Sequence, residues 1–173
     1  MTRTRRLGLV ILIVVSCTAC DQAVKSIAKE SLAASPPLSL LNDFVRIEYS
    51  ENPGAILGLG AGLPSPIRLL FFIIFVSLIL TLTLVFTFNP RGYSLMQIAG
   101  LALVAAGGMG NLLDRLFNNG VVIDYVSFGI GALRTGIFNV ADVAIMAGGV
   151  IVVLFSARPQ GPKGLPDPLG GIS

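Results

Sequence analysis

The sequence of 173 residues contains no histidine and no tryptophan, and only 12% of its residues are charged. Histidine is the usual general base near neutral pH and the commonest metal ligand in proteins. Its absence excludes zinc peptidases and hydrolases of the Ser-His-Asp and Cys-His types. Charged residues make up about a quarter of an average soluble domain, so a chain that is 54% hydrophobic is too apolar to be one.

Long hydrophobic runs account for this composition. About 20 predominantly apolar residues are needed for a helix to cross a bilayer. The expected spans cover about residues 7–25, 67–88, 93–113 and 136–157. We therefore predict an all-α membrane protein of four transmembrane helices, with a single domain over residues 1–157. Residues 158–173 are rich in proline and glycine and are expected to form a disordered cytoplasmic tail.

The first span can also be interpreted as a secretory signal peptide. Arg3, Arg5 and Arg6 precede an apolar run, and the residues before Cys17 and Cys20 resemble a lipoprotein cleavage site. A secreted lipoprotein would not need three further spans, so we favour a retained helix. The CxxC pair has no second pair of ligands to complete a metal site, and we interpret it as two small residues of a membrane helix.

The basic residues indicate how the chain is oriented. With the N-terminus in the cytoplasm, six of the twelve basic residues lie on short cytoplasmic segments, as the positive-inside rule favours. Both termini are then cytoplasmic, and every acidic residue except Asp167 lies at the outer face. The net charge is only +3, and no stripe of arginine and aromatic residues indicates nucleic-acid binding. Any catalytic chemistry is expected at the outer face.

The long loop between the first two spans predicts a small β-sheet. From residue 44 to residue 50, apolar side chains alternate with polar ones, which is the period of a strand. Asn-Pro-Gly at residues 52–54 then indicates a turn. We expect an antiparallel sheet over about residues 38–60, lying on the outer (periplasmic) surface of the membrane.

Four polar clusters occur at membrane depth, where ionisable residues are costly and usually functional. In chain order they contain Asp21 and Lys25, then Asn111, Asp114 and Arg115, then Asp124, and finally Asn139 and Asp142. The first pair has the i, i+4 spacing of a structural ion pair on a helix. The second cluster shares one helix face and follows glycines that let a backbone or a ligand approach closely.

Asp124 and Asp142 are the candidate catalytic pair. Two carboxylates that lie close together share one proton, so one can activate water while the other donates to a carbonyl oxygen. This acid–base chemistry needs neither metal nor histidine. The sequence alone does not bring the two residues together, and helix ends capped at the membrane interface remain the alternative reading.

Taken in order, the clusters resemble the motifs of lipoprotein signal peptidase, also called signal peptidase II. The matching elements are Asp21-Gln22-x-x-Lys25, Asn52-x-Gly54-Ala55, Gly107-Gly108-x-x-Asn111-Leu112-x-Asp114-Arg115, Val122-Ile123-Asp124-Tyr125 and Phe138-Asn139-x-Ala141-Asp142. The resemblance implies an aspartyl endopeptidase of the bacterial inner membrane. It implies removal of the signal peptide of a prolipoprotein just before its diacylglyceryl-modified cysteine.

The resemblance also implies roles for individual residues. Asp124 and Asp142 resemble the catalytic pair. The positions that resemble substrate-binding ones are Asn52, Gly54, Gly108, Asn111, Arg115, Asn139 and Ala141. The positions that resemble structural or site-supporting ones are Asp21, Lys25 and Asp114. Two departures keep apolar character: Ile56-Leu57 replaces an aromatic residue, and Tyr125 replaces phenylalanine.

The expected partners follow from the same resemblance. They are lipidated prolipoproteins, membrane lipids and cyclic peptide inhibitors of the globomycin type, with no metal and no organic cofactor. We expect the chain to act as a monomer. A small transporter or channel is the alternative, because ionisable residues occur within a helix bundle. Against it, the polar residues gather at one face and do not trace a path across the membrane.

Overall fold

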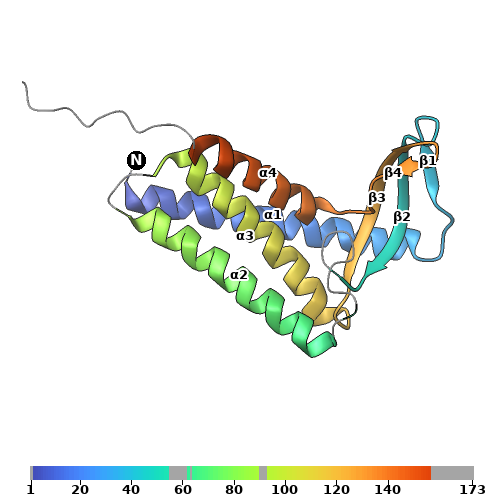
Figure 1. Ribbon diagram of the computed structural model, residues 1–173, viewed down its shortest axis with the longest axis horizontal. Coiled ribbons are helices and arrows are strands. Elements are labelled where there is room, and N and C mark those ends of the chain that lie inside the picture. The colour runs from blue at the N-terminus through green and yellow to red at the C-terminus, as the bar shows by residue number, and fades with distance from the viewer. Residues whose placement is uncertain (1, 55–61, 63, 90–92, 157–173) are drawn as a thin grey trace, which may run out of the picture.

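The structure, a computed structural model, describes residues 2–54, 62, 64–89 and 93–156. In these segments the helices are α1 (Arg3–Leu32), α2 (Ser65–Phe88), α3 (Leu95–Phe117) and α4 (Val140–Ser156). The strands are β1 (Leu38–Leu40), β2 (Val45–Asn52), β3 (Val122–Ile130) and β4 (Leu133–Arg134). Figure 1 shows the helices side by side in a bundle, with the sheet across the end opposite the N-terminus.

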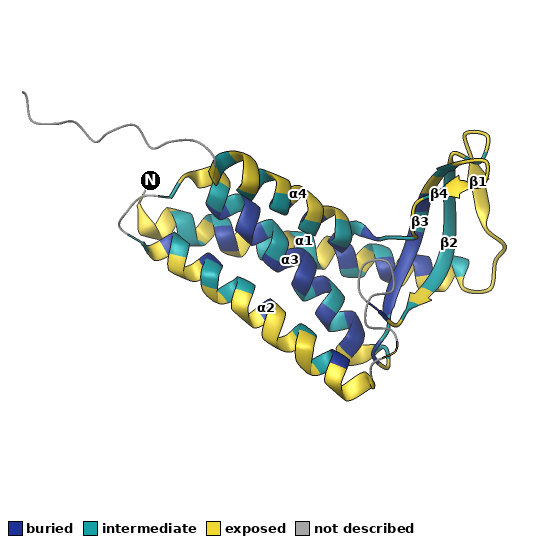
Figure 2. Ribbon diagram, in the orientation of Figure 1, coloured by how far each residue is buried: buried dark blue, intermediate teal, exposed yellow. Residues whose placement is uncertain are grey.

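The helix surfaces are those of a membrane protein. Large apolar side chains of α2, such as Phe71, Ile74 and Leu78, are more than half exposed (Figure 2). Contiguous apolar surface of this kind is not normal for a monomer in water. Three helices, α1, α2 and α3, are long and apolar enough to cross a membrane. The 17 residues of α4 extend about 25 Å, slightly less than the ~30 Å of a hydrocarbon core.

The helices differ from the expected spans mainly at their ends. Helix α1 continues well beyond residue 25, because the side chains of Asp21 and Lys25 turn inward and are buried. Helix α4 begins later than expected, because Phe138 forms a bridge with Val126 of β3. The segment before α4 is therefore attached to the sheet and does not extend the helix.

The CxxC pair lies within the continuous helix α1. Both Cys17 and Cys20 have free thiols. Between them, the hydroxyl of Thr18 donates to the carbonyl oxygen of Ala106 in α3 at 3.1 Å. This stretch thus packs as a helix of the bundle, which supports a retained first helix over a cleaved signal peptide.

Close backbone contact between α3 and α4 forms the centre of the bundle. Helix α3 begins with a capping box formed by Ser94 and Gln97, which satisfies amide groups that a helix start otherwise leaves unpaired. Further along, a Cβ on Gly100 would lie 2.9 Å from the carbonyl oxygen of Gly148, and a Cβ on Gly107 would collide with the carbonyl oxygen of Ala141. Small residues permit this approach, which drives helix packing where no hydrophobic effect operates.

The sheet is antiparallel, with the strand order β1-β2-β3-β4. The predicted β region is confirmed for β1 and β2, whereas its continuation at residues 55–61 lies outside the described residues. Strands β3 and β4 were not predicted. Residues 122–130 of β3 include a buried stretch without clear alternation, and such a run has no strand period to identify it.

Candidate active site

Asp124 lies on β3 where the sheet meets the end of the bundle, and it is only 2% exposed. Its Oδ2 accepts a hydrogen bond from Nδ2 of Asn52 at 2.9 Å, and its Oδ1 accepts one from Nδ2 of Asn139 at 2.6 Å. The pKa of Asp124 is raised to about 6. Burial is the largest cause and the charge of Asp142 adds to it, while the two amide donors oppose the shift. A carboxyl group with this pKa can hold or release a proton near neutral pH.

A β-bulge brings Asn52 to this carboxylate. The register of β2 against β3 shifts between Ile47 and Ser50. An extra residue in one strand exchanges the sheet faces on which the following side chains lie. Asn52 therefore shares the face of Asp124. Its own Oδ1 accepts from the backbone N–H of Gly54 at 2.9 Å, which leaves Nδ2 to face the carboxylate.

Asp142 lies in the first turn of α4 and takes part in a reciprocal cap. Oδ1 of Asn139 accepts from the backbone N–H of Asp142 at 2.9 Å, and the backbone N–H of Asn139 donates to Oδ2 of Asp142 at 3.3 Å. This is the arrangement of a capping box, with aspartate in place of glutamate. The other oxygen, Oδ1 of Asp142, accepts from Nδ2 of Asn111 at 2.9 Å. Every oxygen of both aspartates therefore has an amide donor.

Both aspartates line one cavity of about 880 Å³ between α2, α3, α4 and the sheet. The predicted site residues that line it are Asn52, Gly54, Gly108, Asn111, Arg115, Asp124 and Asp142. Asn139 and Ala141 do not line it but are buried beside it. Asn139 reaches both aspartates, whereas Ala141 contributes a backbone N–H that donates to Asp21. The structure thus brings together residues that lie up to 90 positions apart, from 52 to 142.

Arg115 joins three parts of the site. Its guanidinium donates to the carbonyl oxygens of Asn111 and Gly54, the first at 2.9 Å. Its Cζ lies 3.7 Å from the centre of the Phe72 ring, a cation–π contact. Among the described residues, Nε of Arg115 has no hydrogen-bond partner although it is buried. Arg115 therefore has a donor left for another acceptor at the cavity wall.

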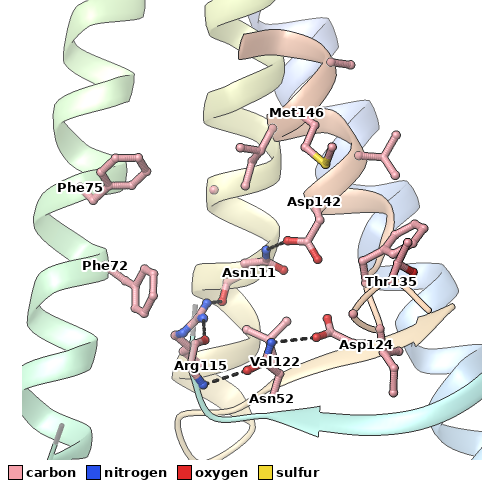
Figure 3. A pocket seen from close by; sticks show the side chains of 18 of the residues that line it. Asn52, Phe72, Phe75, Asn111, Arg115, Val122, Asp124, Thr135, Asp142 and Met146 are labelled. Atoms are coloured by element: carbon pink, nitrogen blue, oxygen red, sulfur yellow. Dashed lines mark hydrogen bonds between the residues drawn. The ribbon is translucent and has the colours of Figure 1, made fainter. Parts of the chain in front are cut away.

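An aromatic wall faces these polar groups, and the sequence reasoning missed it. Phe71, Phe72 and Phe75 of α2 line the cavity. In Figure 3, Phe72 and Phe75 of α2 lie opposite Asn111 and Asp142. The aromatic residues of the second span are a weak signal, because a lipid-facing helix contains the same residue types.

A buried ion cluster lies behind the two aspartates. Nζ of Lys25 lies 2.8 Å from Asp21 and 3.0 Å from Asp114, and all three side chains are at most 2% exposed. Gln22 completes the cluster, since its Nε2 donates to Asp114 at 2.8 Å. The resemblance predicts a structural or site-supporting role for the three charged residues, and the structure places Lys25 in contact with Asn111 of the cavity wall. The part played by Gln22 was not predicted, although it lies between the two charged residues of its motif.

Two carboxylates that share a cavity at one end of a membrane helix bundle are the arrangement expected of a membrane aspartic peptidase. Residues 13–158 match the family described as signal peptidase (SPase) II, Peptidase_A8, and the chain belongs to this family. It is a multi-pass bacterial membrane enzyme that acts as a lipoprotein signal peptidase. The transporter alternative is therefore wrong.

Known relatives resemble the chain over most of its length. The lipoprotein signal peptidase of Desulforapulum autotrophicum is 34% identical over 87% of this chain and 92% of its own. That of Syntrophus aciditrophicus is 36% identical over 83% of this chain and 88% of its own. A solved bacterial membrane enzyme, determined in meso at 2.3 Å resolution, is 27% identical, with a TM-score of 0.75 over 91% of this chain and 92% of that one.

Proposed function

We propose that the chain cuts diacylglyceryl-modified prolipoproteins just before the lipidated cysteine, with Asp124 and Asp142 as the catalytic pair. The observation that carries this proposal is that both carboxylates face one cavity and are held there by amide donors. Amide donors orient a carboxylate without supplying a counter-charge, so the pair keeps its capacity to exchange protons.

In the proposed reaction the two carboxyl groups carry one proton between them. Asp124 holds it, in keeping with a pKa of about 6, and donates a hydrogen bond to the oxygen of the scissile carbonyl. The ionised Asp142 takes a proton from water as the water oxygen attacks the carbonyl carbon. Asp142 then delivers that proton to the leaving nitrogen as the C–N bond breaks, which releases the signal peptide and the new N-terminus of the lipidated cysteine.

The cavity offers both polar and apolar surface to such a substrate. Asn52 and Arg115 lie at its polar end, and the unpaired Nε of Arg115 suits a peptide carbonyl. Phe75 and Val150 line its apolar part between α2 and α4, where acyl chains or apolar side chains of the signal peptide would pack. A Cβ on Gly108 would lie 3.2 Å from Val76, so a larger residue here would narrow the cavity.

The proposed orientation places the sheet at the outer (periplasmic) surface of the inner membrane and both termini in the cytoplasm. Charge density on the short loops supports this arrangement. Helix α4 would complete the four-span domain predicted for residues 1–157, and the cytoplasmic tail predicted for residues 158–173 lies outside the described residues. We further propose that the enzyme acts as a monomer and that globomycin-type cyclic peptides inhibit it by occupying the cavity.

The test is cleavage of a diacylglyceryl-modified prolipoprotein by the purified protein in detergent micelles, with the unlipidated precursor alongside. Only the lipidated form should be cut, and Asp124→Asn and Asp142→Asn should each reduce the rate by at least about a thousandfold, as loss of an acid or base commonly does. Asp43→Asn is the matched control, because Asp43 lies at the far end of the sheet in contact with Arg46. Normal cleavage by either site variant would refute the assignment of the pair.

A further inference from the structure

We propose that Lys25 is a positioning residue for catalysis, which fixes the orientation of the Asn111 side-chain amide and thereby the hydrogen bond that Asp142 receives. The inference rests on the proposed function of Asp142. It concerns a residue that lies outside the cavity lining and acts only through a neighbour.

Lys25 makes three short contacts from a fully buried position. Its Nζ lies 2.8 Å from Oδ2 of Asp21, 3.0 Å from Oδ2 of Asp114 and 2.8 Å from Oδ1 of Asn111. An ammonium group has three donors and no acceptor, so each of its protons has one partner here. The two aspartates are enough to balance the positive charge of Lys25. Its third N–H donates a hydrogen bond to the neutral side-chain amide of Asn111 at the active site.

This contact determines which way the Asn111 amide faces. Because Lys25 can only donate, the atom of Asn111 in front of it must be the oxygen. Nδ2 of Asn139 also donates to this oxygen, at 3.2 Å. The nitrogen of Asn111 must then face Asp142, to which it donates at 2.9 Å. If the amide were flipped, its NH₂ group would face the ammonium group of Lys25 and its oxygen would face the carboxylate of Asp142. Both contacts would be repulsive, and both are buried.

The same cluster also holds the backbone on which both aspartates stand. Oδ1 of Asp21 accepts from the N–H of Ala141, and Oδ2 of Asp114 accepts from the N–H of Ile123, both at 2.9 Å. These are the residues directly before Asp142 and Asp124. Lys25 lies between the two anchoring carboxylates, so α1 connects α3, α4 and β3 at a single buried point. If Lys25 had only a structural role, holding this backbone would be its whole contribution. Its contact with Asn111 adds a link to the carboxylate of Asp142.

Loss of Lys25 should also change the pH dependence of the reaction. The charged or titratable groups around the aspartates are Asp21 and Lys25 of α1, Arg68 of α2, Asp114 and Arg115 of α3, and Tyr125 of β3. Lys25 favours the ionised form of Asp124 by its charge, and through Asn111 it keeps a hydrogen-bond donor on the carboxylate of Asp142. Without Lys25, Asp124 should retain its proton to higher pH, and Asp142 should lose an oriented donor.

The first experiment compares Lys25→Met with Lys29→Met in the full-length protein, measuring cleavage of the lipidated substrate as a function of pH. Lys29 lies one turn further along α1 and contacts Asn118 at 3.4 Å on the exposed surface, which makes it a matched control. We expect the rate profile of Lys25→Met to move to higher pH by about one unit with little change in KM, and that of Lys29→Met to overlay the wild type. A folded Lys25→Met protein with the wild-type profile overturns the proposal.

A second variant covers the case in which Lys25→Met does not fold. Asp21→Asn combined with Lys25→Met keeps the net charge of the cluster, and the new amide retains an oxygen for the N–H of Ala141. This variant removes the donor to Asn111 without changing the net charge, so a lower kcat at an unchanged KM and an unchanged melting temperature supports orientation by Lys25. A wild-type kcat refutes it. Wild-type protein that fails to cut the substrate would instead refute the proposed function, so the two failures are distinguishable.

Discussion

At the scale of single residues, asparagine is the main means by which this site holds its carboxylates. Asn52, Asn111 and Asn139 each donate to an aspartate through Nδ2. Each amide is oriented by a second contact on its oxygen, from Gly54, Lys25 or the backbone of Asp142. An amide satisfied on both sides is locked by its partners, whereas a solvent-facing amide would rotate freely.

The raised pKa of Asp124 predicts how cleavage depends on pH. If the active pair carries its proton on Asp124, raising the pH through about 6 removes that proton and inactivates the free enzyme. The value of kcat/KM should therefore fall about tenfold for each pH unit above this point, because kcat/KM reports ionisation of the free enzyme. The decrease of kcat should begin at a higher pH than that of kcat/KM. Bound substrate excludes water and thereby favours the neutral form of the Asp124 carboxyl group.

Measurement of kcat/KM between about pH 4.5 and 8.5 in detergent micelles would check this prediction. The substrate should have no group that titrates in this range, so that the limb belongs to the enzyme. A value of kcat/KM that stays constant up to pH 8 would show that the proton on Asp124 is not required.

At the scale of elements, the contact of α3 with α4 determines where the Asp142 carboxylate lies. The two helices approach closely at Gly100, Gly107 and Gly148, where a carbonyl oxygen of the facing helix occupies the space that a Cβ would need. The hydrophobic effect does not drive helices together within lipid, so van der Waals packing and hydrogen bonds must hold α3 against α4. Any residue that separates the helices also withdraws Asp142 from Asn111, because that hydrogen bond crosses the same interface.

Neighbouring glycines on α4 allow this contact to be tested. A Cβ on Gly148 would collide with the carbonyl oxygen of Gly100 and would lie 2.9 Å from Cγ2 of Val104, whereas a Cβ on Gly149 would meet nothing within 4 Å. Gly148→Ala should lower stability by about 1–3 kcal/mol, the usual cost of overpacking, and should also reduce cleavage. Thermal unfolding in detergent would measure the difference, with Gly149→Ala as control. Equal melting temperatures for the two variants would contradict tight packing at Gly148.

At the scale of the whole molecule, the outer part of the sheet, away from the two aspartates, has one apolar and one polar face. By register, Leu40, Val45 and Phe128 lie on one face, while Ser39 and Arg46 lie on the other. The apolar face is also the face of the cavity, since Phe128 lines it. In Figure 1 the sheet extends past α4 at the end of the bundle. Its apolar face would then lie against lipid, and its polar face would be exposed to water.

Adjacent residues on opposite faces of β1 provide a test of this placement. In a protein whose native cysteines are replaced by alanine, a fluorophore on Leu40→Cys should be quenched by brominated lipid, because apolar surface enters the bilayer interface. A fluorophore on Ser39→Cys should be quenched by iodide from water instead. Both side chains are exposed in the isolated chain, so equal quenching by iodide would place both faces in water and refute the arrangement.

Local sequence patterns were sufficient to predict the helices and to single out the polar residues of the candidate site. Long apolar runs identify membrane spans because every backbone N–H and C=O group in the bilayer must be hydrogen-bonded within the protein, which a continuous helix achieves. Ionisable residues are conspicuous in such runs, because their burial in lipid is costly. Asp21, Lys25, Asp124 and Asp142 could therefore be singled out, and the order of their motifs was enough to indicate the family.

The geometry of the site required the tertiary structure. Strand β3 was not predicted, because its buried stretch has no alternation, and without β3 there is no position for Asp124 beside α4. The bulge that turns Asn52 toward Asp124 depends on the pairing of β2 with a partner 70 positions away, Val122. The three contacts of Lys25 join residues on two helices. Contacts of this range depend on how elements pack, and the spacing of residues along one element contains no information about that packing.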